Sequence, residues 1–169
     1  MPRAAAITRQ TVDLGAWPDL VVIYLGMKAK SVRGLGAIAR LGPQISSAVA
    51  EKPDGLLLHE NMLFSLLPLH VGMRQYWRDL DSLERWTGEG WHRGWWTGFL
   101  RDPDGTAFWH ETYRRGGGFK AIYDNLDVPT GLMRFAPAVR ARGPMFSARG
   151  RLGEAGAGPA PPVAESALE

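Results

Sequence analysis

The sequence predicts an α+β domain in which two helices cover one face of an antiparallel sheet. An apolar, β-branched run at residues 19–27 is typical of a buried strand, and helical spacing of apolar residues follows at residues 31–50. Two alternating runs with a short connection then indicate a hairpin. A second helix and a fourth strand complete the order strand, helix, strand, strand, helix, strand, which is the ferredoxin-like pattern.

The first helix is expected to begin after Ser31, whose hydroxyl suits an N-cap. Its apolar positions, from Leu35 to Val49, fall on one side. The pair Gly42-Pro43 lies inside it, and proline lacks the amide hydrogen that a helix interior needs. We therefore expect a kink, or two helical pieces, near Pro43.

The hairpin is predicted from strands at residues 56–63 and 69–78. Successive side chains of a strand point to opposite faces, so His59 and Asn61 share one face and Glu60 takes the other. The sequence thus predicts a histidine and an amide next to each other on one face of the sheet.

The second half of the fold begins with a helix at residues 79–86, capped by Asp79 or Asp81. A further helical piece is predicted at residues 91–100, because its aromatic residues recur at helical spacing. A turn then leads into the fourth strand at residues 106–114.

One domain is expected at residues 19–138, after a polar N-terminal arm at residues 1–18. Residues 119–123, which follow a triple glycine, are expected to extend the sheet briefly. Residues 139–169 are rich in Ala, Gly, Pro, Arg and Ser and are predicted to be a disordered tail. One sheet face has no helices to cover it, so a homodimer with the sheets packed face to face is expected.

Composition excludes several classes of function. The 169 residues contain no cysteine, so thiol catalysis and disulfides are excluded, and the four histidines lack metal-binding spacing. A net charge of +3 does not by itself indicate nucleic-acid binding. No apolar run suits a signal core or a membrane span. We expect a cytoplasmic protein with no metal, nucleic acid or membrane partner.

Five segments across residues 20–135 resemble a known family. They are GMKAK, MRQYWRDLDSLERW, FWHETY, AIYDNL and the spacing His92-x3-Trp96-x2-Phe99. Together they resemble the fumagillin-pathway monooxygenase-like family, within the dimeric α+β barrel superfamily that includes the antibiotic biosynthesis monooxygenases. The resemblance implies a ferredoxin-like fold, a dimer and a small-molecule pocket between sheet and helices. It leaves the reaction open, because the superfamily holds cofactor-free oxygenases, haem-degrading oxygenases, haem-dependent dehydratases, isomerases and cyclases.

His92 and Trp96 form the first candidate site. At positions i and i+4 of a helix, both side chains project from one face. The resemblance implies that His92 is a haem ligand or a general base, and that Trp96 lines an oxygenation pocket. The alternative is a histidine that is exposed at a helix end or hydrogen-bonds a neighbouring carbonyl.

His110 and Glu111 form the second candidate site. As neighbours on a strand they face opposite ways, one towards the pocket and one towards the dimer interface. His110 is a candidate base near neutral pH. Glu111 is expected to pair with an arginine such as Arg74 or Arg78 across the sheet.

Asn61 is a candidate for holding dioxygen or an oxyanion by hydrogen bonding, and the alternative is an ordinary polar pair with His59. Arg74 is a candidate for binding a carboxylate, or it forms a cross-strand salt bridge. The full set of predicted substrate-binding residues is Tyr24, His59, Arg74, Tyr76, Trp95, Phe99, Glu111 and Tyr113.

These observations together predict a tailoring enzyme of secondary metabolism, specifically a monooxygenase-like oxygenase without a dedicated cofactor. An apolar substrate would supply electrons to dioxygen, with His92, His110, Asn61 and Trp96 as the catalytic residues. The alternatives are a haem-dependent oxygenase or dehydratase with His92 as axial ligand, a cofactor-free isomerase or cyclase, and a non-catalytic binding module.

Overall fold

The structure, a computed structural model, describes five stretches of the chain. They are residues 8–88, 102–116, 123–124, 129 and 131–143. The chain divides into two compact units, each described here by itself. One unit is Asp19–Arg114, and the other combines Met1–Pro18 with Arg115–Glu169.

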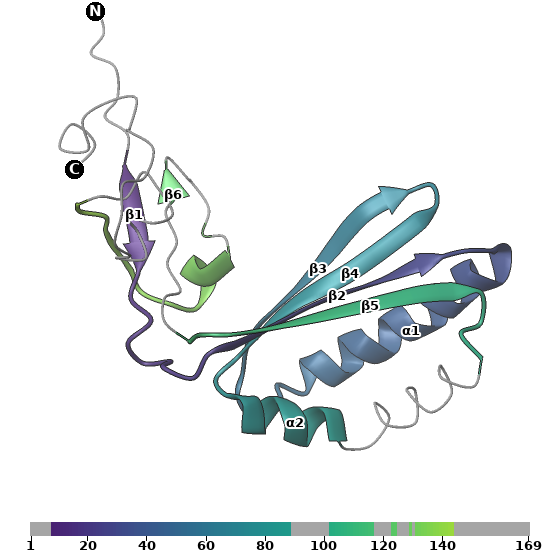
Figure 1. Ribbon diagram of the computed structural model, residues 1–169, viewed down its shortest axis with the longest axis horizontal. Coiled ribbons are helices and arrows are strands. Elements are labelled where there is room, and N and C mark those ends of the chain that lie inside the picture. The colour runs from purple at the N-terminus through teal and green to yellow at the C-terminus, as the bar shows by residue number, and fades with distance from the viewer. Residues whose placement is uncertain (1–7, 89–101, 117–122, 125–128, 130, 144–169) are drawn as a thin grey trace, which may run out of the picture. The chain divides into compact units, whose positions relative to one another are not determined.

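The larger sheet belongs to Asp19–Arg114 and contains four antiparallel strands in the order β3-β4-β2-β5 (Figure 1). Their bounds are Val21–Ala29 for β2, Leu56–Leu66 for β3, Leu69–Trp77 for β4 and Thr106–Arg114 for β5. The fourth predicted strand is confirmed residue for residue, and β3 runs three residues further than expected. The predicted antiparallel α+β fold is therefore confirmed.

Both helices of this unit cover the same face of the sheet (Figure 1). Helix α1 spans Val32–Ala50, and the hydroxyl of Ser31 accepts from the amide of Gly34 at 3.3 Å, so the predicted N-cap is confirmed. The helix runs unbroken through Pro43, so the expected division into two pieces is wrong. Apolar residues continue on its sheet-facing side at Ile38, before the proline, and at Ile45, after it.

Helix α2 spans Leu80–Gly88. Of the two caps that the sequence allowed, Asp79 is the one that acts: its Oδ1 accepts from the amide of Ser82 at 2.7 Å. Arg78 holds the same carboxylate at 2.8 Å through Nε. Among the described residues, no helix combines the length and apolar character needed to cross a bilayer.

The core of this unit lies between the sheet and α2. It is built around the buried side chains of Val21, Ile23, Trp77 and Leu83. Trp77 is fully buried, and its ring centroid lies 5.3 Å from that of Trp86 on α2. Because strand side chains alternate, every second residue of β4 faces the helices together with Trp77.

The second unit holds a smaller sheet in the order β6-β1-β7. Its strands are Arg9–Val12 for β1, Tyr123–Asp124 for β6 and Ala138–Arg140 for β7, with a 3-10 helix at Gly131–Arg134. The expected N-terminal arm therefore contains a strand, whose backbone pairs with β6 and β7.

Three predictions are affected by this arrangement. Tyr123–Asp124 pairs with β1, so the expectation that residues 119–123 extend the main sheet is wrong where the structure describes it. The units part at Arg114, whereas the sequence placed the end of its domain at residue 138; those domain boundaries stay a prediction. The predicted disorder of the tail concerns residues 144–169, which lie outside the described residues.

Candidate functional site

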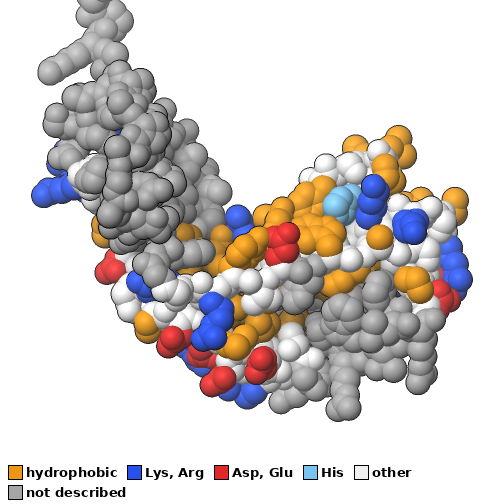
Figure 2. Space-filling model, viewed as in Figure 1, with side chains coloured by type: hydrophobic (Ala, Val, Ile, Leu, Met, Phe, Trp, Pro, Cys, Tyr) orange, Lys and Arg blue, Asp and Glu red, His pale blue; other side chains and the backbone are white. Residues whose placement is uncertain are grey.

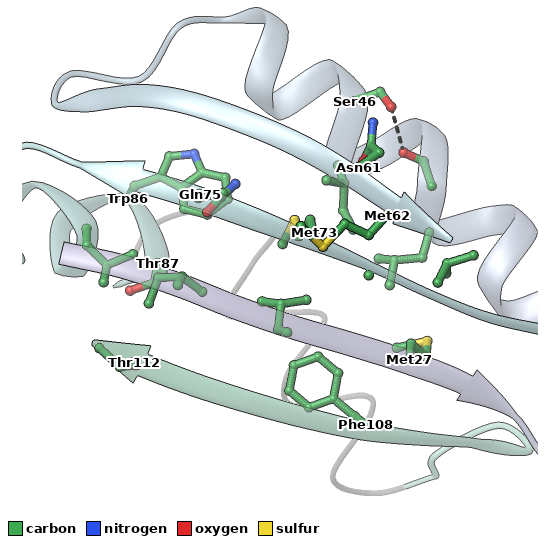
Figure 3. A pocket seen from close by; sticks show the side chains of 18 of the residues that line it. Met27, Ser46, Asn61, Met62, Met73, Gln75, Trp86, Thr87, Phe108 and Thr112 are labelled. Atoms are coloured by element: carbon green, nitrogen blue, oxygen red, sulfur yellow. Dashed lines mark hydrogen bonds between the residues drawn. The ribbon is translucent and has the colours of Figure 1, made fainter. Parts of the chain in front are cut away.

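A cavity of about 630 Å³ lies between the larger sheet and the two helices. This volume is within the range of small-molecule pockets, roughly 300–1,000 Å³. Met27, Met73 and Phe108 line it from three neighbouring strands, and Trp86 lines it from α2 (Figure 3). The cavity thus occupies the place where the family resemblance implied a small-molecule pocket.

Most side chains around the cavity are apolar. The polar residues among the described lining are Ser46, Asn61, Gln75, Glu84, Thr87 and Thr112. Ser46 donates its hydroxyl to the carbonyl of Gly42 within α1, at 3.1 Å. The described lining contains no lysine or arginine, and Glu84 is its one charged residue. An apolar compound with few polar groups fits such a site best.

A chain of four hydrogen-bonded side chains ends at this cavity. Nε1 of Trp77 donates to Oε1 of Gln75 at 3.2 Å. Nε2 of Gln75 lies 3.2 Å from Nδ1 of His59, and Nε2 of His59 lies 3.0 Å from Oδ1 of Asn61. The first two members are almost completely buried, and the last one lines the cavity. We call these four residues the relay.

Burial favours the neutral form of the histidine in the relay. Burial lowers the pKa of the His59 imidazole below its ordinary value of 6.5, while the hydrogen bond to Asn61 and the charge of Glu60 act in the opposite direction. A neutral imidazole has one donor and one acceptor nitrogen, which is what its two partners in the relay require.

The sheet face opposite the helices carries an aromatic cluster of Tyr24, Phe64, His70 and Trp109. The ring of Trp109 lies 4.8 Å from that of Tyr24 and 5.7 Å from that of Phe64, centroid to centroid. In Figure 2, hydrophobic side chains gather over the strands on the side away from α1 and α2. This cluster covers part of the face that the sequence assigned to a partner subunit.

Several predicted substrate-binding residues lie on this outer face rather than around the cavity. Tyr24 belongs to the aromatic cluster. Arg74 forms the cross-strand salt bridge that the sequence allowed, with Glu60 at 2.7 Å, and its guanidinium lies 5.4 Å from the ring centre of Tyr76. Tyr24, Arg74 and Tyr76 are not among the residues that line the cavity.

The pair Glu111 and Tyr113 lies on the same outer face of β5. The phenol of Tyr113 donates to Oε2 of Glu111, and this bond raises the pKa of the phenol above its ordinary value. Both side chains are exposed. They are brought together with each other and not with the cavity.

The remaining predicted site residues cannot be placed by their side chains. His92, Trp95, Trp96 and Phe99 lie outside the described residues. His110 occupies β5 opposite Leu25 in the strand register, and its side chain is outside the described part. Of the predicted catalytic residues, Asn61 is therefore the one that the structure places in the cavity.

The described residues do not fit a haem in this cavity. Both ring nitrogens of His59 are engaged in the relay, so neither offers a free axial ligand. The described lining also has no cation for the haem propionates. No group of three or more His, Cys, Asp or Glu that could hold a metal ion occurs in the part of the chain described.

Gln75 and Trp77 are site residues that the sequence analysis missed. Both follow Met73 at alternate positions of β4, so the three residues share one face of the strand. A buried glutamine between methionine and tryptophan needs a hydrogen-bonding partner, and this would have been the signal.

Comparison with known proteins supports the family and the fold. The sequence matches the family model described as "Monooxygenase af470-like" over residues 20–132. No protein of curated function shows significant sequence similarity to the chain. An aldoxime dehydratase crystal structure matches with a TM-score of 0.61 and 20% identity, covering 83% of this chain and 42% of that one. The chain thus spans less than half of the length of that enzyme, and the likeness shows the fold.

Two smaller solved proteins are also similar. One is described as a putative antibiotic biosynthesis monooxygenase from Deinococcus radiodurans, with 17% identity, a TM-score of 0.46 and coverage of 58% of this chain and 95% of that one. The other is SnoaB from Streptomyces nogalater, described as a cofactor-independent oxygenase, with 14% identity, a TM-score of 0.41 and coverage of 55% and 90%.

Proposed function

Because the chain belongs to the monooxygenase af470-like family, we propose that it is an oxygenase that acts on an apolar small molecule bound in the cavity between sheet and helices. It uses dioxygen and no dedicated cofactor, and its role is that of a tailoring enzyme in secondary metabolism.

The observation that carries this proposal is the position of Asn61. Its carboxamide lines an otherwise largely apolar cavity (Figure 3). His59 holds it at 3.0 Å. A hydrogen-bonding group held in place at a largely apolar pocket stabilises negative charge that develops on an oxygen of the substrate. Asn61 is exposed in the free protein, so a bound apolar substrate would cover it and displace the water around it, which strengthens the interaction.

The reaction that fits is the oxidation of a carbon acid by dioxygen. A methylene group next to a phenol or enol loses a proton, and the resulting carbanion is stabilised because its charge spreads to the oxygen near Asn61. The carbanion reduces dioxygen and binds it, and loss of water leaves a carbonyl group. In sum, the methylene group and one dioxygen molecule become a carbonyl group and one water molecule, and the substrate supplies all the electrons that reduce dioxygen.

The base that removes the proton is part of the proposal. His92 and His110 stay the candidates from the sequence. Glu84 is an additional one, since it is the one charged residue of the described lining. A carboxylate or an imidazole at the cavity has the acid–base character that proton abstraction needs.

A homodimer is the proposed state of the enzyme. The aromatic cluster and the exposed ring of Tyr113 lie on a sheet face that the helices do not cover. A second copy packed on this face would bury them, as the sequence analysis expected.

The decisive experiment measures oxygen uptake with a panel of apolar phenols and enols that carry an acidic methylene group. A product whose new oxygen derives from isotopically labelled dioxygen supports the proposal, and turnover without oxygen uptake identifies an isomerase or cyclase instead. Asn61→Ala should lower kcat by roughly a hundred- to a thousandfold, as expected for one donor to a developing oxyanion. The matched control is Gln44→Ala, which removes an exposed carboxamide of α1 outside the main cavity.

A haem enzyme would be recognised by colour. If addition of haemin produced a stable Soret band and turnover, the cofactor-free proposal would fail, and His92 would be the first ligand to replace.

A further inference from the structure

We propose that Trp77, acting through Gln75 and His59, fixes the carboxamide of Asn61 as a hydrogen-bond donor towards the cavity, so that the site selects substrates in their oxyanion form, a phenolate or an enolate. The inference deepens the proposed function and rests on it for the statement about substrates. Gln75, Trp77 and His59 are positioning residues, because they act on the ligand only through Asn61.

The direction of the relay begins at the indole. Nε1–H of a tryptophan can donate but not accept, so the atom of Gln75 that faces Trp77 must be the carbonyl oxygen. Trp77 is fully buried and Gln75 is 1% exposed, so water does not compete for these groups. The other end of the Gln75 amide, its NH2 group, then faces His59.

The tautomer of His59 follows from that orientation. An amide NH2 only donates, so Nδ1 of His59, at 3.2 Å, must be the acceptor. The ring proton of the neutral imidazole then resides on Nε2. Protonation of both nitrogens would set a donor against a donor at Gln75, and the burial of the ring also favours the neutral form.

The orientation of Asn61 is the last step. Nε2–H of His59 donates at 3.0 Å, so the atom that it meets is the carbonyl oxygen Oδ1. The NH2 group of Asn61 is thereby the end that remains for a ligand. Asn61 and Ser46 both line the cavity (Figure 3), and the hydroxyl proton of Ser46 is used by the carbonyl of Gly42.

The substrate class follows from the hydrogen-bond donor character of the Asn61 NH2 group. A hydrogen-bond donor in a largely apolar cavity stabilises an acceptor oxygen, and it stabilises a charged oxygen more than a neutral one because charge-assisted hydrogen bonds are stronger. No cation among the described lining residues offers an alternative means of holding an anion.

Nuclear magnetic resonance tests the relay without any substrate. Two-bond 1H–15N spectra of the wild-type histidine rings should show His59 as the Nε2–H tautomer. The His59 signals are assigned by their absence from the spectrum of His59→Gln. In Gln75→Glu the carboxylate accepts from both Trp77 and His59, so His59 should become protonated on Nδ1. A wild-type Nδ1–H tautomer overturns the proposal, and because this measurement needs no core variant, a Gln75 variant that fails to fold does not weaken the test.

Binding of 4-nitrophenol tests the selection for oxyanions. The bound phenol should be enriched in its phenolate form roughly tenfold relative to free solution, as expected for one hydrogen bond to a charged oxygen. Gln75→Glu and Asn61→Ala should abolish this enrichment, whereas Gln44→Ala should retain it. Equal enrichment in wild type and Asn61→Ala overturns the selection.

The two proposals fail separately. Suppose that the protein shows the predicted tautomer and the phenolate enrichment but consumes no oxygen with any compound of the panel. The relay proposal would then stand, and the oxygenase proposal would be rejected. Oxygen uptake by a protein with the opposite tautomer would do the reverse.

Discussion

Nε1 of Trp109 donates to Nε2 of His70 at 2.9 Å on the sheet face away from the helices. The indole lies close over the backbone of β2, because Gly26 pairs with Trp109 in the register and has no side chain. A Cβ atom at Gly26 would meet that indole nitrogen at 2.6 Å. The aromatic cluster therefore depends on a glycine in the middle of a strand.

Gly26→Ala should destabilise the protein by about 1–3 kcal/mol, because the added methyl group overpacks the indole. Gly36→Ala is the matched control: its Cβ would meet only the flexible Arg40 side chain at 3.6 Å, and alanine in a helix should stabilise by about 0.5–1 kcal/mol. Urea denaturation of both variants measures the two effects. A neutral Gly26→Ala would mean that the indole does not rest on the strand.

Asp79→Ala should lower the free energy of unfolding by about 1 kcal/mol, since it removes the acceptor for the Ser82 amide at the start of α2. Asp81→Ala is its control, because Asp81 is exposed and lies within the first turn. Chemical denaturation at neutral pH gives both values, and equal losses would contradict the assignment of the cap.

The Asp79 contribution should also depend on pH. Hydrogen bonds lower the pKa of the carboxyl from 3.8 to about 2. The bond from Arg78 has the largest effect, and the bond from the Ser82 amide has the next largest. With a folded-state pKa below the unfolded value, the contribution is complete above 3.8 and is lost as the pH falls towards 2. The difference between wild type and Asp79→Ala should therefore shrink in acid, and a difference that persists there would contradict it.

His59 should make the protein less stable as the pH falls below 6.5, the ordinary imidazole value. Its folded-state pKa is lowered mainly by burial, so the unfolded chain takes up the proton first. The contribution is thus present above 6.5 and is lost as the pH falls through the folded-state pKa. Urea midpoints between about pH 5 and 8 should decline more steeply for wild type than for His59→Gln; parallel curves would sink this prediction.

Phe64→Asp should dissociate the proposed homodimer. Phe64 is 38% exposed and belongs to the aromatic cluster on the uncovered sheet face, where a charge would oppose burial. Light scattering after size-exclusion chromatography gives the mass, and circular dichroism checks that the variant is folded. Leu35→Asp, at a 43% exposed position on α1, should leave the mass unchanged. If wild type is a monomer across the micromolar range, the dimer is refuted directly.

Strand alternation allowed much of the fold to be predicted, because β5 and the hairpin have regular periods. It did not reveal which sheet face the helices cover. Tyr24 and Arg74 were assigned to the pocket, yet both lie on the outer face, where the residues are as aromatic as those inside. A sheet with apolar residues on both faces loses the polarity contrast that would have distinguished them.

The relay was only half visible for a related reason. His59 and Asn61 were paired on one strand, whereas Gln75 joins them from the neighbouring strand, through the register that sets His59 opposite Gln75. Such a contact depends on strand pairing, which local periodicity does not encode. Strand β1 was not predicted, because the strand has only four residues, RQTV, and most of them are polar.

The small sheet has its first strand in the middle. Arg9–Val12 emerges from the ribosome early, but its partners in β6 and β7 are among the last described residues to be made. The larger sheet, by contrast, is complete once Arg114 has emerged. During synthesis the larger sheet can therefore form while β1 is still without its partners, and a released chain truncated after residue 116 would lack both partner strands of β1 and present that strand to chaperones.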